Sequence, residues 1–484
     1  MNLITLILIA FIVIVGYFIR TIVYPPSNFP KNVPVIPFYV SFLTLFYKIS
    51  QEDIYNIYIR KKIEEHGIVA LYFASRWNLI LQKPEYLQEM FRDLNTFEKS
   101  GNQKKVPYSV LAAYTGDNII SAHGENWKKY RKVLQPGLQK NFDEEPLRKN
   151  SQQLISLIEK DQEKTSGGVL IQHFLQRYTL ANVAVCLLNT DFETLSRSDS
   201  PLHLQQLAVK KEIFKPIFLN FPILDTLPIP SRIQARKEIE KFSKNLCNHI
   251  RRSNEKIDKS ELNLSNSMIA AVETGILTEK QFRDNAVIVF IAGHENPQLF
   301  LTTLLYICAK YPTIQEKLRD EETNSEVPLK ERPYLNSVIY ETLRMYPPIS
   351  QLVNRKTARP AMLSNDVIIP KDTYVGYIGY ATGHDPKVWG ADADNFIPER
   401  WGSNIQEIRT NYLSAKSSSR LIAFHGGMRA CLGERLALTE TRVLLTELLK
   451  ELSWELDPDW FDMMTPGGPL SPFLLKLKFS KLNP

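Results

Sequence analysis

One stretch of the sequence constrains the fold more than any other. The mainly apolar segment from Thr278 to Lys310 is predicted to form a single long helix. Thr278 and Gln281 form a capping box at its start, and Tyr311-Pro312 ends it. At about 1.5 Å per residue such a helix extends roughly 45–50 Å, so it must run through the middle of the molecule.

Pro297 lies inside this segment and predicts a kink. Proline has no amide hydrogen, and its ring crowds the carbonyl of Gly293 four residues earlier. The helix is therefore expected to bend within Ala292 to Asn296 and to leave backbone carbonyls unpaired in the core. Asn296, directly before the proline, is a polar side chain that can fill this need.

The rest of the chain indicates one large domain, mainly α with minor β sheets. Of its 484 residues, 44% are hydrophobic, enough for a sizeable core. No linker or internal repeat divides residues 38–484. Short β-branched or apolar runs predict strands near Ile68 to Tyr72, Val367 to Ile369 and Phe473 to Phe479, and the polar stretch from Ser253 to Asn266 is expected to be a loop.

The amino-terminal residues predict a single membrane anchor over residues 1–23. Met1 to Ile19 contains no charged side chain, and no small-residue cleavage site of a signal peptide is evident. Arg20 and Lys31 follow the apolar stretch, so the positive-inside rule places the body in the cytosol. Prolines between residues 24 and 37 predict a stiff connector. The net charge of +7 favours an acidic partner protein or anionic lipid and does not indicate nucleic acid.

Of the four cysteines, only Cys431 has surroundings that indicate chemistry. The others, at 186, 247 and 308, lie in segments typical of buried small hydrophobes, and no Cys-x-x-Cys pair is present for a zinc site. Cys431 directly precedes an amphipathic helix predicted from Glu434 to Leu452. A cysteine at a helix amino terminus is expected to have a lowered pKa, which favours a metal-binding thiolate.

The residues around Cys431 fit a flat, anionic ligand. Gly427 and Gly433 let the backbone turn and let such a ligand approach closely. Arg429 can meet an anionic edge, and Phe424 can shield the sulfur.

The whole segment, Phe-x-x-Gly-x-Arg-x-Cys-x-Gly from Phe424 to Gly433, resembles the haem-binding loop of the cytochromes P450. Glu341-Thr342-Leu343-Arg344 resembles the Glu-x-x-Arg helix of that family, and Phe396 to Trp401 resembles its downstream arginine segment. The resemblance implies a cytochrome P450 fold whose haem b iron is bound by the thiolate of Cys431. It also implies that Glu341, Arg344 and Arg400 form the family's structural charge triad.

Further residues in the family's register imply contacts with the haem. Trp127 and Arg131 match the Trp-x-x-x-Arg pair that reaches a propionate, and Arg355 supplies another propionate contact by analogy. As isolated residues, they would more often be a core tryptophan and solvated arginines. The residues expected to contact the haem are Cys431, Trp127, Arg131, Arg355, Arg429, Phe424, Gly427, Gly433, Ala292 and Gly293, with Cys431 as the metal ligand.

The long helix departs from the family pattern at one position. Ala292-Gly293-His294-Glu295-Asn296 stands where Ala-Gly-x-Asp/Glu-Thr is usual, and the resemblance implies catalytic roles for Glu295 and Asn296. The expected threonine would help to relay protons, whereas an amide can donate a hydrogen bond but passes a proton less readily than a hydroxyl. Ordinary hydroxylation is therefore disfavoured. A structural role for Asn296 beside Pro297 stays open as an alternative.

Four runs of sequence resemble one branch of the family, the dityrosine-forming cytochromes P450 of yeast. They are Ser100 to Lys105, Ala113 to Asn118, Ala292 to Leu299 and Phe424 to Gly427. The resemblance implies an endoplasmic reticulum enzyme that couples two N-formyl-L-tyrosine molecules into N,N′-bisformyl dityrosine for the spore wall. It would use O2 and electrons from NADPH through NADPH–cytochrome P450 reductase, with cytochrome b5 as a further candidate donor.

Two other functions stay open: a monooxygenase that hydroxylates a lipid, sterol or xenobiotic, and a non-catalytic haem-binding membrane protein. N-formyltyrosine keeps a carboxylate but has no amine charge, so its pocket should offer a cation or amide donors. Asn102, Lys104, Lys105 and Tyr114 fall where the family's first substrate-contacting loop lies, and they are the predicted substrate residues. Exposed lysines and a core tyrosine are the alternative.

Overall fold

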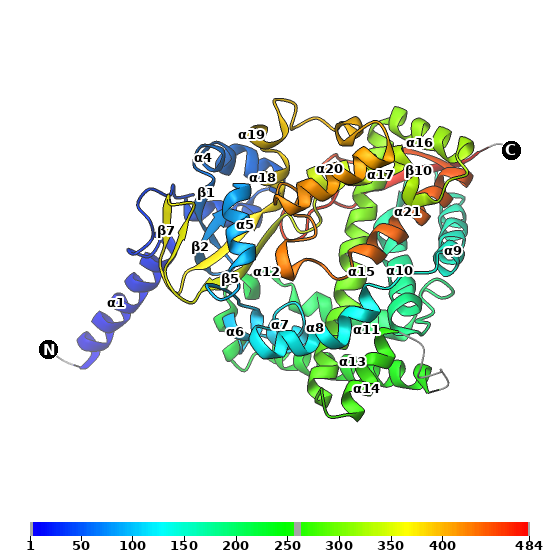
Figure 1. Cartoon of the computed structure of the whole chain (residues 1–484). Coiled ribbons are helices and arrows are strands. Elements are labelled where there is room, and N and C mark those ends of the chain that lie inside the picture. Colours follow the sequence, from blue (N-terminus) through cyan, green and yellow to red (C-terminus); the bar gives the residue numbers. More distant parts are fainter. Residues whose placement is uncertain (1–2, 256–262, 483–484) are drawn as a thin grey trace.

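The computed structural model describes residues 3–255 and 263–482 of the chain. A large helical body makes up most of the molecule, and a smaller region rich in strands lies beside it, next to the amino terminus (Figure 1). The mainly α architecture with small sheets confirms the expected fold class.

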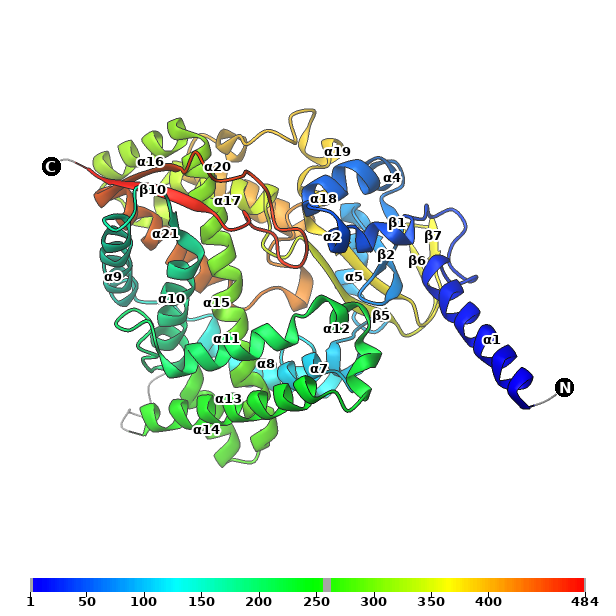
Figure 2. The ribbon, with the colours of Figure 1, turned by 180° about the vertical axis from the view of Figure 1, so that it is seen from behind.

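The predicted central helix is present as α15, Glu279–Lys310. Thr278 and Gln281 form the expected capping box, and both views show α15 running through the helical body (Figures 1 and 2). The helix continues through Pro297, because a proline removes one amide hydrogen bond without ending a helix that is held by packing on all sides. One turn before the proline, His294 Nδ1 lies 2.6 Å from the carbonyl oxygen of Phe290.

Helices α10 (Ile171–Val183), α13 (Pro230–Asn254) and α17 (Pro333–Met345) pack against α15. Helix α21, Glu434–Glu451, follows Cys431 as predicted. The other helices of four residues or more are α1 Leu3–Val23, α2 Leu43–Phe46, α3 Gln51–Ile54, α4 Arg60–His66, α5 Pro84–Arg92, α6 Asn102–Lys105, α7 Val110–Thr115, α8 Gly124–Leu138, α9 Glu145–Gln162, α11 Pro201–Ile213, α12 Pro216–Asn220, α14 Leu264–Glu273, α16 Pro312–Asn324, α18 Gly379–Gly383, α19 Pro386–Trp389 and α20 Ile405–Ser417.

Short 3-10 and π-helical turns connect these elements. They are η1 Phe38–Phe42, η2 Tyr55–Ile59, η3 Ala184–Leu188, η4 Pro222–Thr226, η5 Leu329–Glu331, η6 Pro398–Trp401 and η7 Gly427–Arg429.

Among the described residues, the strands form three sheets, of which the largest positions part of the site. Its strand order is β1-β2-β8-β5-β3. Strand β5 pairs antiparallel with β8 and with β3, and a bulge interrupts the β5–β8 register between Val353 and Arg355. The strands of this sheet are β1 Ile68–Phe73, β2 Arg76–Leu81, β3 Phe97–Lys99, β5 Gln351–Thr357 and β8 Tyr374–Ile378.

Two small sheets complete the fold. One has the order β4-β10-β9, with strands Val169–Leu170, Lys476–Lys481 and Leu452–Leu456, and the other pairs β6 Ala361–Leu363 with β7 Val367–Ile369. The strands expected at Ile68 and Val367 are confirmed. The third prediction began too early, because Phe473 and Leu474 form a turn with positive φ at Leu474 before β10.

The loop predicted from Ser253 to Asn266 is wrong at both ends. Helix α13 continues to Asn254, and α14 begins at Leu264, where the Asn263 side chain caps the helix by accepting from the Asn266 amide. The polar residues at both helix ends suggested a loop. They are buried in the fold, where the Ser265 hydroxyl forms hydrogen bonds with Asn254 and Asn263. Residues 256–262 lie outside the described part of the chain.

Helix α1 projects from the body at the amino terminus (Figures 1 and 2). Residues Ile4–Val23 are long and apolar enough to cross a membrane, and none of that span is buried against the protein. This helix is compatible with the membrane anchor of a P450-like protein. After it, the backbone of residues 34–36 pairs with Ala70 of β1, which ties the connector to the sheet.

Candidate active site

The loop before α21 holds Cys431 in one conformation. The Cys431 amide donates to the Phe424 carbonyl at 2.9 Å. Gly427 has φ of 60°, and a Cβ there would lie 2.8 Å from the Phe91 carbonyl oxygen, so the turn requires glycine. A Cβ on Gly433 would stand 3.9 Å from the Cys431 sulfur, which shows how closely the backbone passes the thiol.

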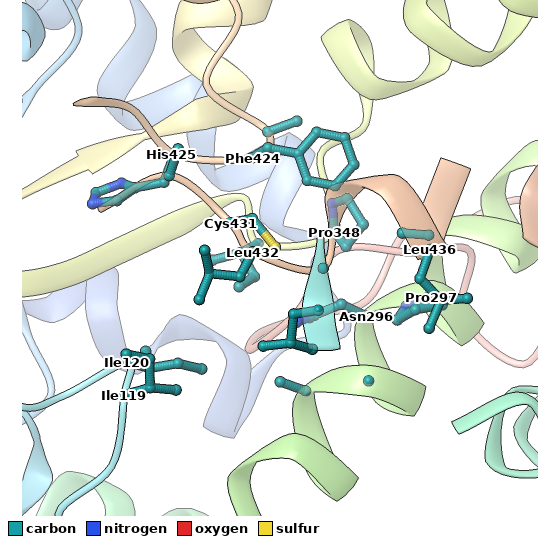
Figure 3. Close-up of a pocket in the computed structure, with 18 of the residues that line it drawn as sticks. Ile119, Ile120, Asn296, Pro297, Pro348, Phe424, His425, Cys431, Leu432 and Leu436 are labelled. Carbon is teal, nitrogen blue, oxygen red and sulfur yellow. The ribbon is translucent and has the colours of Figure 1, made fainter. Parts of the chain in front are cut away.

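A cavity of about 270 Å³ lies between this loop and α15. Cys431 and Asn296 line the same space, with Ile119 and Ile120 on another side (Figure 3). Most of its walls are apolar, which suits a flat hydrophobic ligand. Among the predicted residues, those that line it are Trp127, Arg131, Ala292, Gly293, Asn296, Phe424, Arg429, Cys431 and Gly433.

Two buried cations lie on neighbouring strands beside one edge of the cavity, and of the two Lys99 lines the cavity whereas Arg355 does not. Arg355 of β5 and Lys99 of β3 are directly opposite in the antiparallel register, and their exposed fractions are 0% and 3%. Arg355 donates to the Phe97 carbonyl at 3.1 Å and lies 3.3 Å from Nε2 of His425, while its Nε has no hydrogen-bond partner within the described residues. Burial lowers the pKa of Arg355 to about 10 and holds that of Lys99 well below its usual value.

Two more arginines converge on this edge around Trp127. Arg429 and Arg131 lie 4.6 Å and 5.6 Å from the Trp127 ring centroid. Arg131 donates to the Met428 carbonyl at 2.8 Å, and burial lowers the pKa of Arg429 to about 9. Arg429 also donates to the carbonyls of Ile119, Ile120 and Ala122, at 3.3, 3.1 and 2.9 Å.

None of these four cations forms an ion pair with a carboxylate in the described residues 3–255 and 263–482. A buried cation without a counter-charge is costly, so the edge requires an anionic ligand. A flat macrocycle with two propionate groups satisfies both the apolar walls and the cationic edge. The residues present therefore fit haem b.

The residues before Pro297 face in different directions. Ala292, Gly293 and Asn296 line the cavity, and a Cβ on Gly293 would lie 2.7 Å from Val183 of α10, so this glycine also allows the two helices to pack closely. Glu295 is not among the lining residues. Its Oε1 lies 3.0 Å from the Lys210 amine of α11 and accepts from Gln206 at 3.3 Å.

The predicted charge triad is brought together behind the site. Arg344 pairs with Glu341 at 2.7 Å, and both side chains are fully buried. Arg400 reaches the same carboxylate at 3.4 Å. The Trp401 indole and the Ile397 amide also donate to Glu341, at 3.1 and 3.0 Å, so this buried carboxylate is fully satisfied.

Comparison with known proteins agrees with this geometry. The family model described as cytochrome P450 matches residues 30–478. The chain belongs to the cytochrome P450 family. Cytochrome P450-DIT2 of Saccharomyces cerevisiae is 45% identical over 487 residues, covering 99% of each chain. Cytochrome P450 monooxygenase xanG of Aspergillus fumigatus is 38% identical over 459 residues, covering 91% of this chain and 85% of the relative.

A solved structure supports the fold independently. The heme domain of a cytochrome P450DA mutant superposes with a TM-score of 0.75 at 18% identity, covering 96% of this chain and 98% of that one. As a P450, the chain is a haem-thiolate oxidoreductase that uses O2, a redox-partner reductase and a small-molecule substrate.

The protonation of Cys431 corrects one expectation about this P450. The Cys431 side chain lines the cavity and is exposed toward it. Burial raises the pKa of Cys431, and hydrogen bonds from the Gly433 and Glu434 amides lower it by less. The helix terminus alone therefore does not produce a thiolate, because loss of hydration outweighs two amide hydrogen bonds. A positive ion at the sulfur is needed to favour the ligating form.

The four predicted substrate residues of this P450 lie away from the cavity wall. Asn102 and Lys104 belong to α6, and the Lys105 amine donates to the Val353 carbonyl. Burial lowers the pKa of Lys105 to about 7. Tyr114 of α7 is 3% exposed, and burial near Glu295 raises its pKa. None of the four is among the residues that line the cavity.

Lys99, Asn354 and His425 are among the lining residues of the P450 site that sequence reasoning missed. His425 lies within the recognised loop and has a positive φ of 61°, which its sequence neighbours did not indicate. Lys99 and Asn354 come from strands 255 positions apart in the chain, and no local pattern connects them. Only the pairing of β3 with β5 places them together.

Proposed function

We propose that this P450 couples two N-formyl-L-tyrosine molecules by phenol oxidation into N,N′-bisformyl dityrosine for the spore wall. One observation carries the proposal. Two of the runs that resemble the dityrosine-forming branch, Ala292 to Leu299 and Phe424 to Gly427, supply facing walls of one cavity (Figure 3). The full-length identity of 45% to cytochrome P450-DIT2 supports the same branch.

In this proposal Cys431 binds the haem iron, and Trp127, Arg131, Arg355 and Arg429 hold the propionates. Phe424, Gly433, Ala292 and Gly293 would shape the walls against which the macrocycle lies, and Gly427 would hold the turn of the Cys431 loop against Phe91. When bound, haem supplies the activation of O2 and the one-electron oxidation of phenols. Glu295, paired with Lys210, would hold α11 against α15, which is a positioning role.

Asn296 would favour coupling over oxygen insertion. Its amide lines the cavity opposite Cys431 and can donate a hydrogen bond, but it relays a proton less readily than a threonine hydroxyl. Coupling requires an oxidant for two phenols and needs no transfer of oxygen to the substrate.

The coupling reaction balances with one O2 and one NADPH. Each phenol loses one hydrogen atom, and the two rings form one carbon–carbon bond, so the substrates give up two electrons and two protons. NADPH and a solvent proton supply the other two electrons and two protons through NADPH–cytochrome P450 reductase, with cytochrome b5 as an alternative donor of the second electron. O2 accepts all four electrons and leaves as two waters.

The test combines the purified full-length protein with reductase, NADPH and N-formyl-L-tyrosine and analyses the product by mass. A dimer lighter than two monomers by two hydrogens is expected. Lauric acid serves as the comparison substrate, and a hydroxylated laurate without a tyrosine dimer would favour a monooxygenase. Absence of NADPH consumption with either substrate would favour a non-catalytic haem protein.

We also propose that residues 1–23 anchor the protein in the endoplasmic reticulum membrane and that residues 38–484 form a cytosolic catalytic domain. Residues 24–37 would connect the anchor to this domain. Exposed apolar side chains at Phe214, Ile217, Phe221 and Ile223 support a membrane-facing surface. Phe221 stacks on Phe42 of η1, which contacts α1, so this surface lies near the proposed anchor. Deleting residues 1–23 should leave a protein that salt and detergent extract more readily.

A further inference from the structure

Glu440 is a buried carboxyl group in the wall of the cavity, on the helix that follows Cys431. Among the described residues that line the cavity, it is the one carboxyl. Burial raises the pKa of Glu440 to about 8, so the group holds its proton near neutral pH. The cavity wall therefore contains an acid.

Hydrogen bonds determine which oxygen of Glu440 carries this proton. Asn150 Nδ2 donates to Asn182 Oδ1 at 2.9 Å, so Asn182 turns its own Nδ2 toward Glu440 and donates to Oε2 at 2.9 Å. Oε2 is thus an acceptor, and the proton lies on Oε1. Within the described residues, the buried Oε1 has no hydrogen-bond partner. A buried donor without an acceptor requires a partner from outside the chain.

Glu440 lies on the side of the cavity where Pro297 interrupts the hydrogen bonding of α15. Its partner Asn182 precedes Val183 on α10, and Val183 packs so closely on Gly293 of α15 that a Cβ there would lie 2.7 Å away. Pro297 has no amide hydrogen to give to the Gly293 carbonyl. Gly293, Pro297 and Glu440 line one cavity, so a donor and an acceptor for water are present at this end of it.

Reduction of O2 to water consumes protons inside the cavity, and the other groups near α15 supply them poorly. Asn296 is an amide, and Glu295 does not line the cavity. The Thr441 hydroxyl already donates to a carbonyl one turn earlier in α21, at 2.7 Å. Burial raises the pKa of Tyr377 far above neutral pH. Glu440 is therefore the acid on the α15 side of the cavity.

We propose that Glu440 delivers solvent protons to O2 as this P450 reduces it. The bond from Oε1 to hydrogen breaks, the proton joins the reduced oxygen, and the carboxylate regains a proton from water. Two protons enter by this route for each O2, matching the two electrons that NADPH supplies through the reductase. Asn182 is a positioning residue, because it holds Oε2 and leaves Oε1 facing the cavity. The inference depends on the O2 chemistry of the family and not on which substrate is oxidised.

The acid form of Glu440 predicts a pH dependence of turnover. The titratable groups that interact with it among the described residues are Tyr178 of α10 and Cys186 of η3. Burial raises the pKa of both, that of Cys186 to about 12, so neither is charged near neutral pH. NADPH-driven turnover should fall as the pH rises through about 8, because Glu440 loses its proton there. Glu440→Gln should lack this decline.

The first test detects the proton directly, in the full-length holoenzyme. Infrared difference spectra across the pH range should show a protonated-carboxyl stretch that disappears near pH 8 in the wild type. This change should be absent from Glu440→Gln. Glu451→Gln, at the exposed end of α21, should keep it. A change that persists in Glu440→Gln would overturn the proposal.

The second test separates proton delivery from the shape of the cavity. Glu440→Gln should lower NADPH-driven coupling of N-formyl-L-tyrosine by about 100-fold, the lower end of the range for acid catalysis. Hydrogen peroxide replaces both O2 and NADPH and brings its own protons, so peroxide-driven coupling should stay within about threefold of the wild type. Glu440→Asp keeps an acid and should recover at least about a tenth of the NADPH-driven rate.

A structural role for Glu440 makes different predictions. Equal losses with NADPH and with peroxide, or a lower ratio of haem to protein in Glu440→Gln, would overturn the proposal. If the wild type does not couple N-formyltyrosine, the proposed function fails, and the infrared change together with the rate of NADPH-driven O2 reduction still decides the role of Glu440.

Discussion

The Cys431 wall and the cationic edge of the same cavity are built in opposite ways. The wall comes from ten consecutive residues, Phe424 to Gly433, whose turns and helix start are determined locally. The edge combines Arg429 of this same loop with Lys99, Arg131 and Arg355 from three distant elements, β3, α8 and β5. The comparison teaches that a metal ligand can be recognised from a local sequence motif. The cations that bind an anionic ligand are instead brought together by the packing of strands and helices.

The largest effect is expected when the sulfur of Cys431 is removed. Cys431→Ser is expected to abolish the long-wavelength absorbance of the reduced, carbon monoxide-treated protein and all NADPH-dependent coupling, because thiolate ligation has no substitute in the chain. Absorbance spectra of the purified variant check this. Cys247→Ala, at a buried cysteine in α13, should keep both signals. A Cys431→Ser protein that kept the band would refute the assignment of the ligand.

A second variant contrasts paired buried charges with the unpaired ones at the edge. Glu341→Gln leaves Arg344 buried without its carboxylate, so the free energy of unfolding should fall by about 3–5 kcal/mol. Denaturant unfolding of the full-length protein measures the loss. Lys317→Ala breaks the exposed ion pair with Glu399, whose side chains are 58% and 55% exposed, and it should cost about 1 kcal/mol at most. Equal losses for the two variants would contradict the argument.

The buried, unpaired amine of Lys99 predicts a pH dependence of stability that is larger in the apoprotein than in the haem-loaded protein. Burial lowers the pKa of Lys99 in the folded state, so the unfolded chain binds more protons there and wild-type stability rises with pH. Relative to Lys99→Met, the wild-type apoprotein should gain stability as the pH rises toward the ordinary lysine pKa, by at most about 1.4 kcal/mol per pH unit. Unfolding followed at several pH values checks this. The haem-loaded pair should show a smaller slope, because propionates favour the charged amine, and equal slopes with and without haem would be the contrary result.

The smallest effect is expected on the facing wall, at Asn296. Asn296→Thr restores a proton-relaying hydroxyl and should raise hydroxylated product or uncoupled peroxide relative to dimer by about tenfold or less, a barrier change of about 1.4 kcal/mol at most. Product analysis by mass and a peroxide assay measure the ratio. Asn296→Ala removes the amide without adding a hydroxyl and separates the two effects. An unchanged ratio in the threonine variant would leave Asn296 with only its structural role beside Pro297.

Sequence reasoning succeeded where a signal is local. The capping box at Thr278, the helix after Cys431 and the strand at Val367 each depend on residues within a few positions of one another. It failed where burial changes the structural role or the pKa of a residue. Asn254 and Asn263 were interpreted as loop polarity, yet both are buried at helix ends, and the Cys431 thiol was expected to be acidic although desolvation raises its pKa.

By itself the sequence determined the family, the central helix, the cysteine loop and the apolar amino-terminal helix, because each follows from covalent spacing and local hydrogen bonding. Only the tertiary structure decided which cations share an edge and which lysine faces the cavity. Lys99 and Arg355 become neighbours when β3 pairs with β5, and Asn354, at the bulge in β5, lines the cavity. Charge and hydrogen-bond satisfaction depend on distances across the fold, and no stretch of sequence contains those distances.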